Sequence, residues 1–169
     1  MKNYSIMLAS LFLFSCNCSK QITKVNPQKL VLESSCPKDG DCKIEILENK
    51  KMNVLDDGTG SLYYRLEDDL EHKVIKYTYD KRVKGDLQDA NYREEIVFEI
   101  ENEVKEETIT NDNLQNVKML FGRFCYCKGQ AGNFKVNKGN LKITKEKIDL
   151  DFEIKEVPQI IKNISIGLK

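Results

Sequence analysis

Apolar and polar residues alternate along several stretches of this chain, and this spacing constrains the fold more than any other feature of the sequence. Between residues 148 and 154, isoleucine, leucine and phenylalanine alternate with Asp149, Asp151 and Glu153. Residues 96–100, 75–79 and 62–66 show the same alternation. A period of two places one set of side chains on a core and the other in water, so each stretch predicts a β-strand.

Shorter stretches and the turns between them extend this pattern over the chain. Turn residues such as Asp57-Gly58-Thr59-Gly60 and Lys138-Gly139-Asn140 separate the candidate strands. Residues 112–119 form the clearest candidate for a helical turn. We therefore predict an all-β, antiparallel β-sandwich or barrel of about 8–10 short strands, formed by a single domain at residues 29–169. The shorter strand candidates are residues 29–33, 43–47, 51–55, 134–136, 141–144 and 159–164.

Residues 117–128 differ from the other candidate strands because they are apolar on both faces. Such a strand is buried on both sides, and we expect it in the middle of a sheet. Gly122 predicts a bulge or a close backbone approach there. Arg123 would need a carboxylate partner or an exit to solvent.

The first residues of the chain describe a secretory signal. Lys2 precedes an apolar run at residues 6–14, which is much shorter than the ~20 residues that a membrane-spanning helix needs. Leu13, Ser15 and Cys16 resemble the processing motif of bacterial lipoproteins. The resemblance implies a signal peptide at residues 1–15 and a Cys16 that carries a diacylglyceryl thioether and an acyl chain such as palmitate. An ordinary cleaved signal with a coincidental cysteine is the alternative.

The segment after Cys16 indicates how such an anchor would be used. Residues 16–28 are polar and include Pro27, so they predict a flexible tether. In lipoproteins, acidic residues after the lipidated cysteine can direct surface display and an Asp next to it can retain the protein in the inner membrane. This chain has neutral or basic residues there, with Asn17 first, which by resemblance favours the outer membrane, facing the periplasm. Acidic and basic residues balance over the chain, so we expect no nucleic-acid partner.

The remaining cysteines indicate disulfide bonds, because an exported protein meets oxidising conditions. Cys18 lies in the tether and is left unpaired in the simplest scheme. Cys36 and Cys42 would staple a loop between the first two strands, whereas a bridge from Cys36 to Cys125 would close a longer loop with more stabilisation. Cys125 and Cys127 would share one face of a strand, with Cα atoms about 6.6 Å apart, at the outer limit for a disulfide.

The same cysteines leave other chemistries open. A strained bridge between Cys125 and Cys127 would be easily reduced and could serve as a redox pair. However, no C-x-x-C sequence or helix start lowers a thiol pKa there. A zinc site would need an unusual cysteine spacing. We predict no cofactor and no catalytic residue.

Polar and charged clusters offer little else for catalysis. Calcium at residues 39–41 or 56–58 is conceivable, without the ligand spacing of an EF-hand. His72 is the single histidine and lies in the charged stretch 67–73, which predicts a solvated loop and suggests no catalytic triad. Residues 94–107 are rich in glutamate and residues 135–147 in lysine. We expect two solvated outer faces, or cross-strand ion pairs if these strands are neighbours.

Three segments, residues 36–42, 120–130 and 157–161, resemble small bacterial lipoproteins of unassigned function. The resemblance implies a shared fold and no particular activity. We favour a membrane-anchored envelope protein with a non-enzymatic binding or interaction domain, whose partner is an envelope protein or a small ligand. The alternatives are a structural or assembly component without a ligand pocket, and a thiol-redox or metal-binding protein that uses Cys125 and Cys127.

Overall fold

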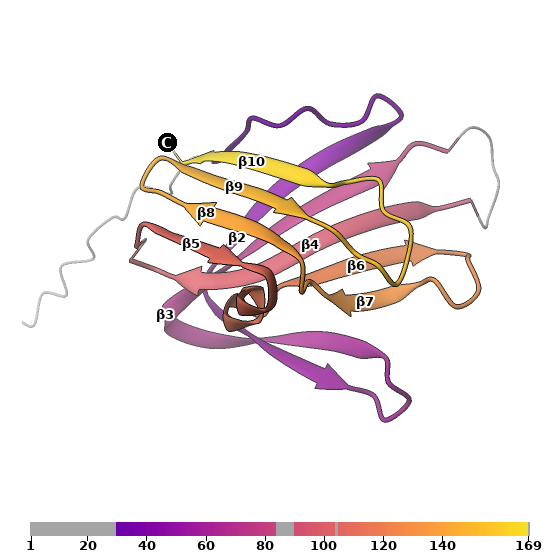
Figure 1. The fold of residues 1–169 in the computed structure, drawn as a ribbon, viewed down its shortest axis with the longest axis horizontal. Coiled ribbons are helices and arrows are strands. Elements are labelled where there is room, and N and C mark those ends of the chain that lie inside the picture. Colours follow the sequence, from indigo (N-terminus) through magenta and orange to yellow (C-terminus); the bar gives the residue numbers. More distant parts are fainter. Residues whose placement is uncertain (1–29, 84–89, 104, 169) are drawn as a thin grey trace, which may run out of the picture.

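Two antiparallel sheets make up the fold (Figure 1). The computed structural model describes residues 30–83, 90–103 and 105–168, and over these residues it contains ten strands and one short 3-10 helix, η1 (Asn111–Val117). The predicted all-β class is confirmed. The predicted helical turn is confirmed as η1. The signal peptide, Cys16 and Cys18 lie outside the described residues.

The first sheet has five strands in the order β1-β10-β9-β8-β5. Ile148, Leu150 and Phe152 point into the core from β9, as the alternation predicts. Leu30 pairs with Leu168, so the two ends of the described domain lie side by side. The strands are β1 (Leu30–Leu32), β5 (Glu107–Thr110), β8 (Gly139–Ile143), β9 (Lys147–Phe152) and β10 (Asn163–Leu168).

The second sheet has the order β2-β3-β4-β6-β7, and β3 also pairs with β7. This extra pairing joins Leu62 to Asn133 and closes β3, β4, β6 and β7 into a small barrel. The strands are β2 (Gly40–Asp56), β3 (Leu62–Lys81), β4 (Tyr92–Glu101), β6 (Leu120–Cys125) and β7 (Gly132–Lys135).

The β2–β3 hairpin corrects the prediction that all strands are short. The candidates at 43–47 and 51–55 are two halves of β2, and those at 62–66 and 75–79 are two halves of β3. Residues 69–72 of β3 lie opposite Asn49 alone, and Asn49 has a positive φ of 56°. Such an irregularity bends a strand without ending it. His72 therefore lies within β3, and the predicted loop at residues 67–73 is wrong.

The main core fills the space between the two sheets. It includes Ile75 of β3, Phe98 of β4 and Phe121 of β6 from one side, and Leu141 of β8 and Leu150 of β9 from the other. A second cluster lies on the opposite face of the second sheet and consists of Met52, Val74, Val97 and Leu120. The distal half of the β2–β3 hairpin covers this cluster with partly buried apolar side chains. Both faces of β4 are therefore buried.

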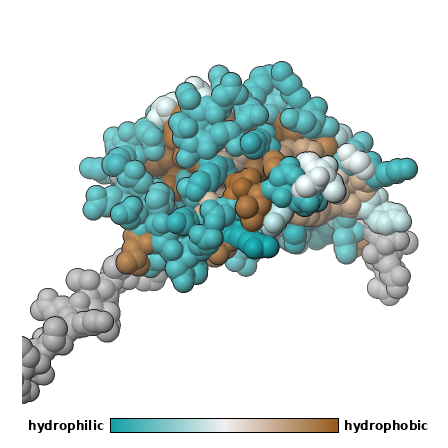
Figure 2. Space-filling model, turned by 90° about the horizontal axis from the view of Figure 1, so that it is seen from below, coloured by the Kyte–Doolittle hydropathy of each residue, from teal (hydrophilic) through white to brown (hydrophobic). Residues whose placement is uncertain are grey.

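The surface on the side of the hairpin turn is mainly hydrophilic. Figure 2 shows this side, on which small apolar patches are separated by polar side chains. Within the part of the chain that the structure describes, no helix is long and apolar enough to cross a membrane.

The predicted strand at residues 117–128 is shorter than expected. Val117 belongs to η1, and β6 lies between β4 and β7, so that β4 is the middle strand of the sheet. Leu120 and Phe121 are fully buried on opposite faces, as predicted. A Cβ atom on Gly122 would lie 2.7 Å from the Phe124 ring and 2.9 Å from Oδ1 of Asn133. Gly122 is therefore closely approached, but by two side chains rather than by the backbone that was predicted as one alternative.

The glutamates of β4 are buried rather than solvated, which corrects the prediction of an acidic outer face. Glu94, Glu95 and Glu99 are 1, 3 and 6% exposed. Glu99 accepts a hydrogen bond from the Met52 amide at 2.7 Å and pairs with Lys118 at 2.7 Å. These bonds connect the distal hairpin to β4. The lysine-rich stretch begins at the end of β7 and continues into β8 and β9 of the other sheet, where Lys142 is opposite Thr108.

Candidate binding site at the disulfide end

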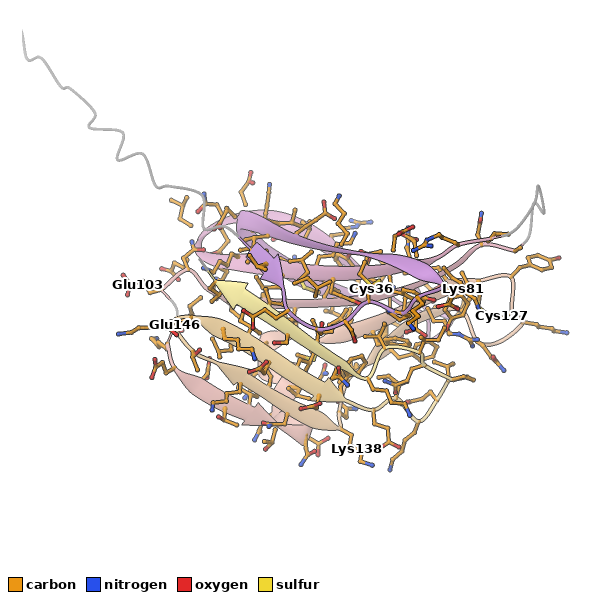
Figure 3. The ribbon with its side chains drawn as sticks, turned by 90° about the horizontal axis from the view of Figure 1, so that it is seen from above. Cys36, Lys81, Glu103, Cys127, Lys138 and Glu146 are labelled. Carbon is orange, nitrogen blue, oxygen red and sulfur yellow. A yellow bond between two sulfur atoms is a disulfide. The ribbon has the colours of Figure 1, made fainter. Side chains whose placement is uncertain are left out.

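Both cysteine pairs lie at one end of the sandwich. Figure 3 shows Cys36, Lys81 and Cys127 at this end and Glu103 and Glu146 at the other. The amide of Leu168 donates to the carbonyl of Glu146, and Leu168 pairs with Leu30. The start of β1 therefore lies at the end opposite to the cysteines. We call residues 36–42, 79–82, 91–94 and 123–130 the disulfide end.

Cys36 and Cys42 form a disulfide across the loop that leads into β2, with Cα atoms 5.7 Å apart. This is the local staple that the sequence offered as one alternative, and the long bridge from Cys36 to Cys125 is not formed. Both side chains pack against the main core. The Tyr77 hydroxyl donates a hydrogen bond to the Cys42 sulfur at 2.9 Å. By the chain-entropy argument the loop closure stabilises the fold by about 2–3 kcal/mol.

The loop closed by this disulfide is fixed by further contacts. Asp39 accepts a hydrogen bond from the Tyr79 hydroxyl at 2.9 Å and pairs with Lys81 at 3.5 Å. Arg82 donates to the carbonyl of Gly40 at 2.8 Å. A Cβ atom at position 40 would lie 2.2 Å from the Tyr79 ring, so glycine is required there. The Asp39 carboxylate, one of the groups considered as a calcium ligand, thus binds Tyr79 and Lys81.

Cys125 and Cys127 form the second pair, with Cα atoms 5.3 Å apart. The sequence predicted about 6.6 Å because it placed both residues on one extended strand. Instead, β6 ends at Cys125, and the chain turns through Gly129, which has a φ of 72°. Tyr126 stands between the two cysteines with 84% of its surface exposed. The pair encloses a single residue, so loop closure contributes less here, about 1–2 kcal/mol.

A cavity of about 570 Å³ adjoins this second pair. The Arg93 guanidinium lies 4.5 Å from the centre of the Phe124 ring, which places a cation and an aromatic ring together in its wall. This volume falls within the range of small-ligand sites. The cavity is lined by Asp80, Lys81, Asn91, Tyr92, Arg93, Phe124, Cys125 and Tyr126.

Glu94 organises a hydrogen-bond network beneath the cavity. Its carboxyl oxygens accept hydrogen bonds from the amides of Ile160 and Ile161, at 2.7 and 2.8 Å, and from the Tyr92 hydroxyl at 2.5 Å. Tyr92 in turn accepts a hydrogen bond from Nε of Arg123 at 3.3 Å. The network joins β4 to the segment that precedes β10.

Arg123 is buried without a direct carboxylate partner among the described residues. The sequence had predicted such a partner or an exit to solvent. Nη1 of Arg123 instead donates to Oε1 of Gln130 at 2.6 Å, and the guanidinium lies 5.3 Å from the centre of the Tyr92 ring. Tyr92 connects Arg123 to Glu94. Through the hydrogen bond to Gln130, the guanidinium stabilises the turn that contains Cys127.

Two tyrosines of the disulfide end, Tyr79 and Tyr92, and the neighbouring Tyr77 have raised pKa values. Burial raises the pKa of Tyr77 to about 12. Burial, followed by the hydrogen bond to Asp39, raises the pKa of Tyr79 to about 12. Burial, followed by the hydrogen bond to Glu94, raises the pKa of Tyr92 to about 12. The folded state therefore holds these phenolic protons more tightly than the unfolded chain does, where the pKa is about 10.

These tyrosines predict an alkaline loss of stability. Because their pKa values are raised on folding, their contribution is complete below pH ~10 and is lost as the pH rises from there through about 12. We expect the free energy of unfolding, measured by urea titration over this range, to fall with pH. The Tyr77→Phe variant should lose stability less steeply than the wild type. An equal slope in both proteins would contradict the assignment.

The other candidate residues are not brought to the disulfide end. Nδ1 of His72 lies 2.8 Å from Oδ1 of Asp69, in the middle of β3. Asp56 and Asp57 accept backbone amides of their own turn. Over the residues that the structure describes, no three His, Cys, Asp or Glu side chains are grouped to hold a metal ion. The four domain cysteines form two separate pairs rather than one cluster.

A larger, open depression of about 880 Å³ lies next to the segment that follows β9. Its floor includes Phe152, Ile154 and Val157, and Lys138 at its rim pairs with Glu153. Gln159 accepts a hydrogen bond from the Ile154 amide at 2.6 Å and so fixes the depression's wall.

Sequence reasoning missed Tyr92, Glu94 and the partners of Arg123. One signal was present for Glu94, because it continues the inward-facing series of Ile96, Phe98 and Ile100. A charged residue in such a series indicates a buried polar network. Comparisons with protein families, curated proteins and solved structures give no match for this chain, so its site is known only from its own residues.

Proposed function

We propose that this protein is a lipoprotein of the bacterial cell envelope, anchored through Cys16, and that its domain presents the disulfide end as a non-enzymatic binding surface. The supporting observation is the position of Leu30, which begins the described domain at the end opposite to both cysteine pairs. A tether that enters at Leu30 holds the disulfide end away from the lipid. The outer membrane, with the domain in the periplasm, is the proposed location.

The chemistry of the disulfide end supports a binding role. Two disulfides suit an oxidising compartment. Tyr126 is exposed, and Arg93 and Phe124 line the cavity wall beside it. Aromatic residues and arginine supply much of the energy at binding interfaces. The Glu94 network and the Cys36–Cys42 bridge hold this surface rigid, which lowers the entropic cost of binding a ligand.

The anchor is tested by replacing Cys16 with serine, and Cys18→Ser is the matched control in the same tether. We expect the wild type and Cys18→Ser to fractionate with membranes and to carry the added mass of a diacylglyceryl group and an acyl chain. The Cys16→Ser protein should lack both properties. Intact mass spectrometry of each purified protein gives the result. An unmodified Cys16 in a membrane-bound wild type would overturn the proposed anchor.

The binding surface is tested in cells that produce the protein with a photo-crosslinking residue at one of two exposed positions. Position 126 lies at the disulfide end, and position 70 lines the cavity that contains Glu103 at the other end. Leu70 is 83% exposed and Tyr126 84%, so the two positions are equally accessible. We expect a discrete crosslinked species from position 126 alone. Crosslinks from both positions or from neither would contradict the proposal.

A further inference from the structure

We propose that the Cys125–Cys127 disulfide is exchangeable and oxidises the dithiol of a polypeptide that reaches the disulfide end. This activity goes beyond the proposed binding function. The proposal rests on the contrast between the two disulfides, on the charges around the second one and on the exposed aromatic residue beside it.

The two disulfides have different roles in the fold. Cys36 and Cys42 pack against the main core, and the Cys42 sulfur accepts the Tyr77 hydrogen bond. All four cysteines are partly exposed, but Cys125 and Cys127 pack against neither core cluster. The β6–β7 hairpin around them is already held by its own pairs, including Arg123 with Gly132. Reduction of Cys125–Cys127 therefore leaves the hairpin closed.

The spacing of this pair favours exchange. A disulfide between residues two positions apart closes a small ring, which restricts the geometry of the bond. Constrained disulfides have higher reduction potentials than unconstrained structural ones and are reduced more readily. The Cys36–Cys42 bridge, whose cysteines are six positions apart, closes a larger ring.

Basic residues line the two hollows next to the pair, and one of them, Lys81, also pairs with Asp39 at 3.5 Å. Lys81 and Arg93 line the cavity that includes Cys125, with Asp80 as the acidic residue there. Lys128 lines the adjoining hollow together with both cysteines. Positive charge stabilises a thiolate, so it assists the cleavage of the disulfide.

An exposed aromatic side chain lies directly at the bond. Tyr126 is between the two cysteines, and Phe124 and Arg93 continue the surface into the cavity. Aromatic and guanidinium groups bind apolar and aromatic segments of an extended chain. A polypeptide dithiol can therefore be held next to the sulfur atoms.

The reaction balances as a thiol–disulfide exchange. A substrate thiolate attacks one sulfur, the Cys125–Cys127 bond breaks, and the released cysteine takes up a proton. The second substrate thiolate then attacks the mixed disulfide, a substrate disulfide forms, and the other cysteine is released and protonated. The substrate loses two electrons and two protons, and the cysteine pair gains them.

The redox equilibrium tests this proposal within one protein. Full-length wild-type protein in detergent is equilibrated with glutathione buffers of increasing reducing strength. Free thiols are then alkylated, and the peptides of each pair are quantified by mass spectrometry. We expect Cys125–Cys127 to become half reduced at a reducing strength at least tenfold lower than Cys36–Cys42 requires. Equal reducibility of the two pairs would overturn the proposal.

The transfer step is measured with a synthetic peptide that contains two cysteines and a tyrosine. Under anaerobic conditions the wild type should oxidise about one equivalent of peptide, and the Cys125→Ser/Cys127→Ser double variant should oxidise none. Tyr126→Ala should slow the transfer at least fivefold without changing the redox equilibrium, which a purely structural role would not produce. Peptide oxidation that is equal in the wild type and the double variant would overturn the proposal. The redox equilibrium is measured on the wild type alone, so it tests the proposal even if the double variant folds poorly.

Discussion

Replacement of Glu94 by alanine is expected to lower the free energy of unfolding by about 3 kcal/mol, because it removes the buried acceptor of three hydrogen bonds at once. The amides of Ile160 and Ile161 and the Tyr92 hydroxyl would lose their partner, and Glu94, which they bind, is only 1% exposed. The midpoint of thermal unfolding should fall by roughly 10 °C. Urea and thermal unfolding followed by circular dichroism measure both quantities.

Glu101 provides the control for this variant on the same strand. Its side chain is 53% exposed and pairs with Lys105, so the Glu101→Ala change should leave the free energy of unfolding nearly unchanged. Glu94→Gln should fall between the two variants, because one acceptor oxygen remains for the three donors. A loss of stability at Glu94 no larger than that at Glu101 would show that the buried network contributes little.

Replacement of Gly139 by alanine is the second change with a large expected effect, again about 3 kcal/mol. Gly139 begins β8 opposite Phe152 and has a φ of 155°. A Cβ atom there would lie 2.3 Å from the carbonyl oxygen of Asp151 and 2.9 Å from Cα of Phe152. Because these are backbone atoms, β8 and β9 would have to separate. Urea unfolding should show the loss.

Gly132 separates the steric effect at Gly139 from the effect of φ. It has a comparable φ of 133°, but no atom lies within 4 Å of a Cβ at this position. Gly132→Ala should therefore cost only the backbone term, about 1 kcal/mol. If both alanine variants lose equal stability, the close contact with β9 is not the cause.

The sequence predicts the strands where one face meets the core and the other meets water. The alternation at residues 148–154 and 96–100 identifies β9 and the inward face of β4, because burial alone determines which residues are tolerated there. The turn at residues 111–117 also follows from local sequence. These features depend on neighbours in the chain, which the sequence shows directly.

The long hairpin and the buried glutamates could not be predicted because they depend on partners far away in the chain. The irregularity at Asn49 divides β2 and β3 into halves that read as separate strands. Glu99 can be buried because two groups bind its carboxylate. Lys118, which directly follows η1, forms an ion pair with it, and the Met52 amide of the hairpin donates a hydrogen bond to it. A glutamate run on its own is indistinguishable from a solvated face.

The candidate site was predicted in part. The cysteines were singled out from their number and from the indications of export, and the structure arranges them in two local pairs. The sequence could not show that both pairs lie at one end of the sandwich with Tyr126 exposed between two of them. That arrangement follows from the order of strands in the second sheet, where β2 and β6 are separated by β3 and β4.

The neighbouring positions of Leu30 and Leu168 make the domain suitable for circular permutation. These residues pair across β1 and β10, so a short linker could join them. The exposed turn at residues 57–60 offers a place for new chain ends. Among the described residues, the carboxylates of Asp56 and Asp57 accept hydrogen bonds only from residues 58–61, so opening this turn would break few other contacts. A protein rearranged in this way would begin at the hairpin turn, so a segment joined to its new N-terminus would leave the domain on a different side.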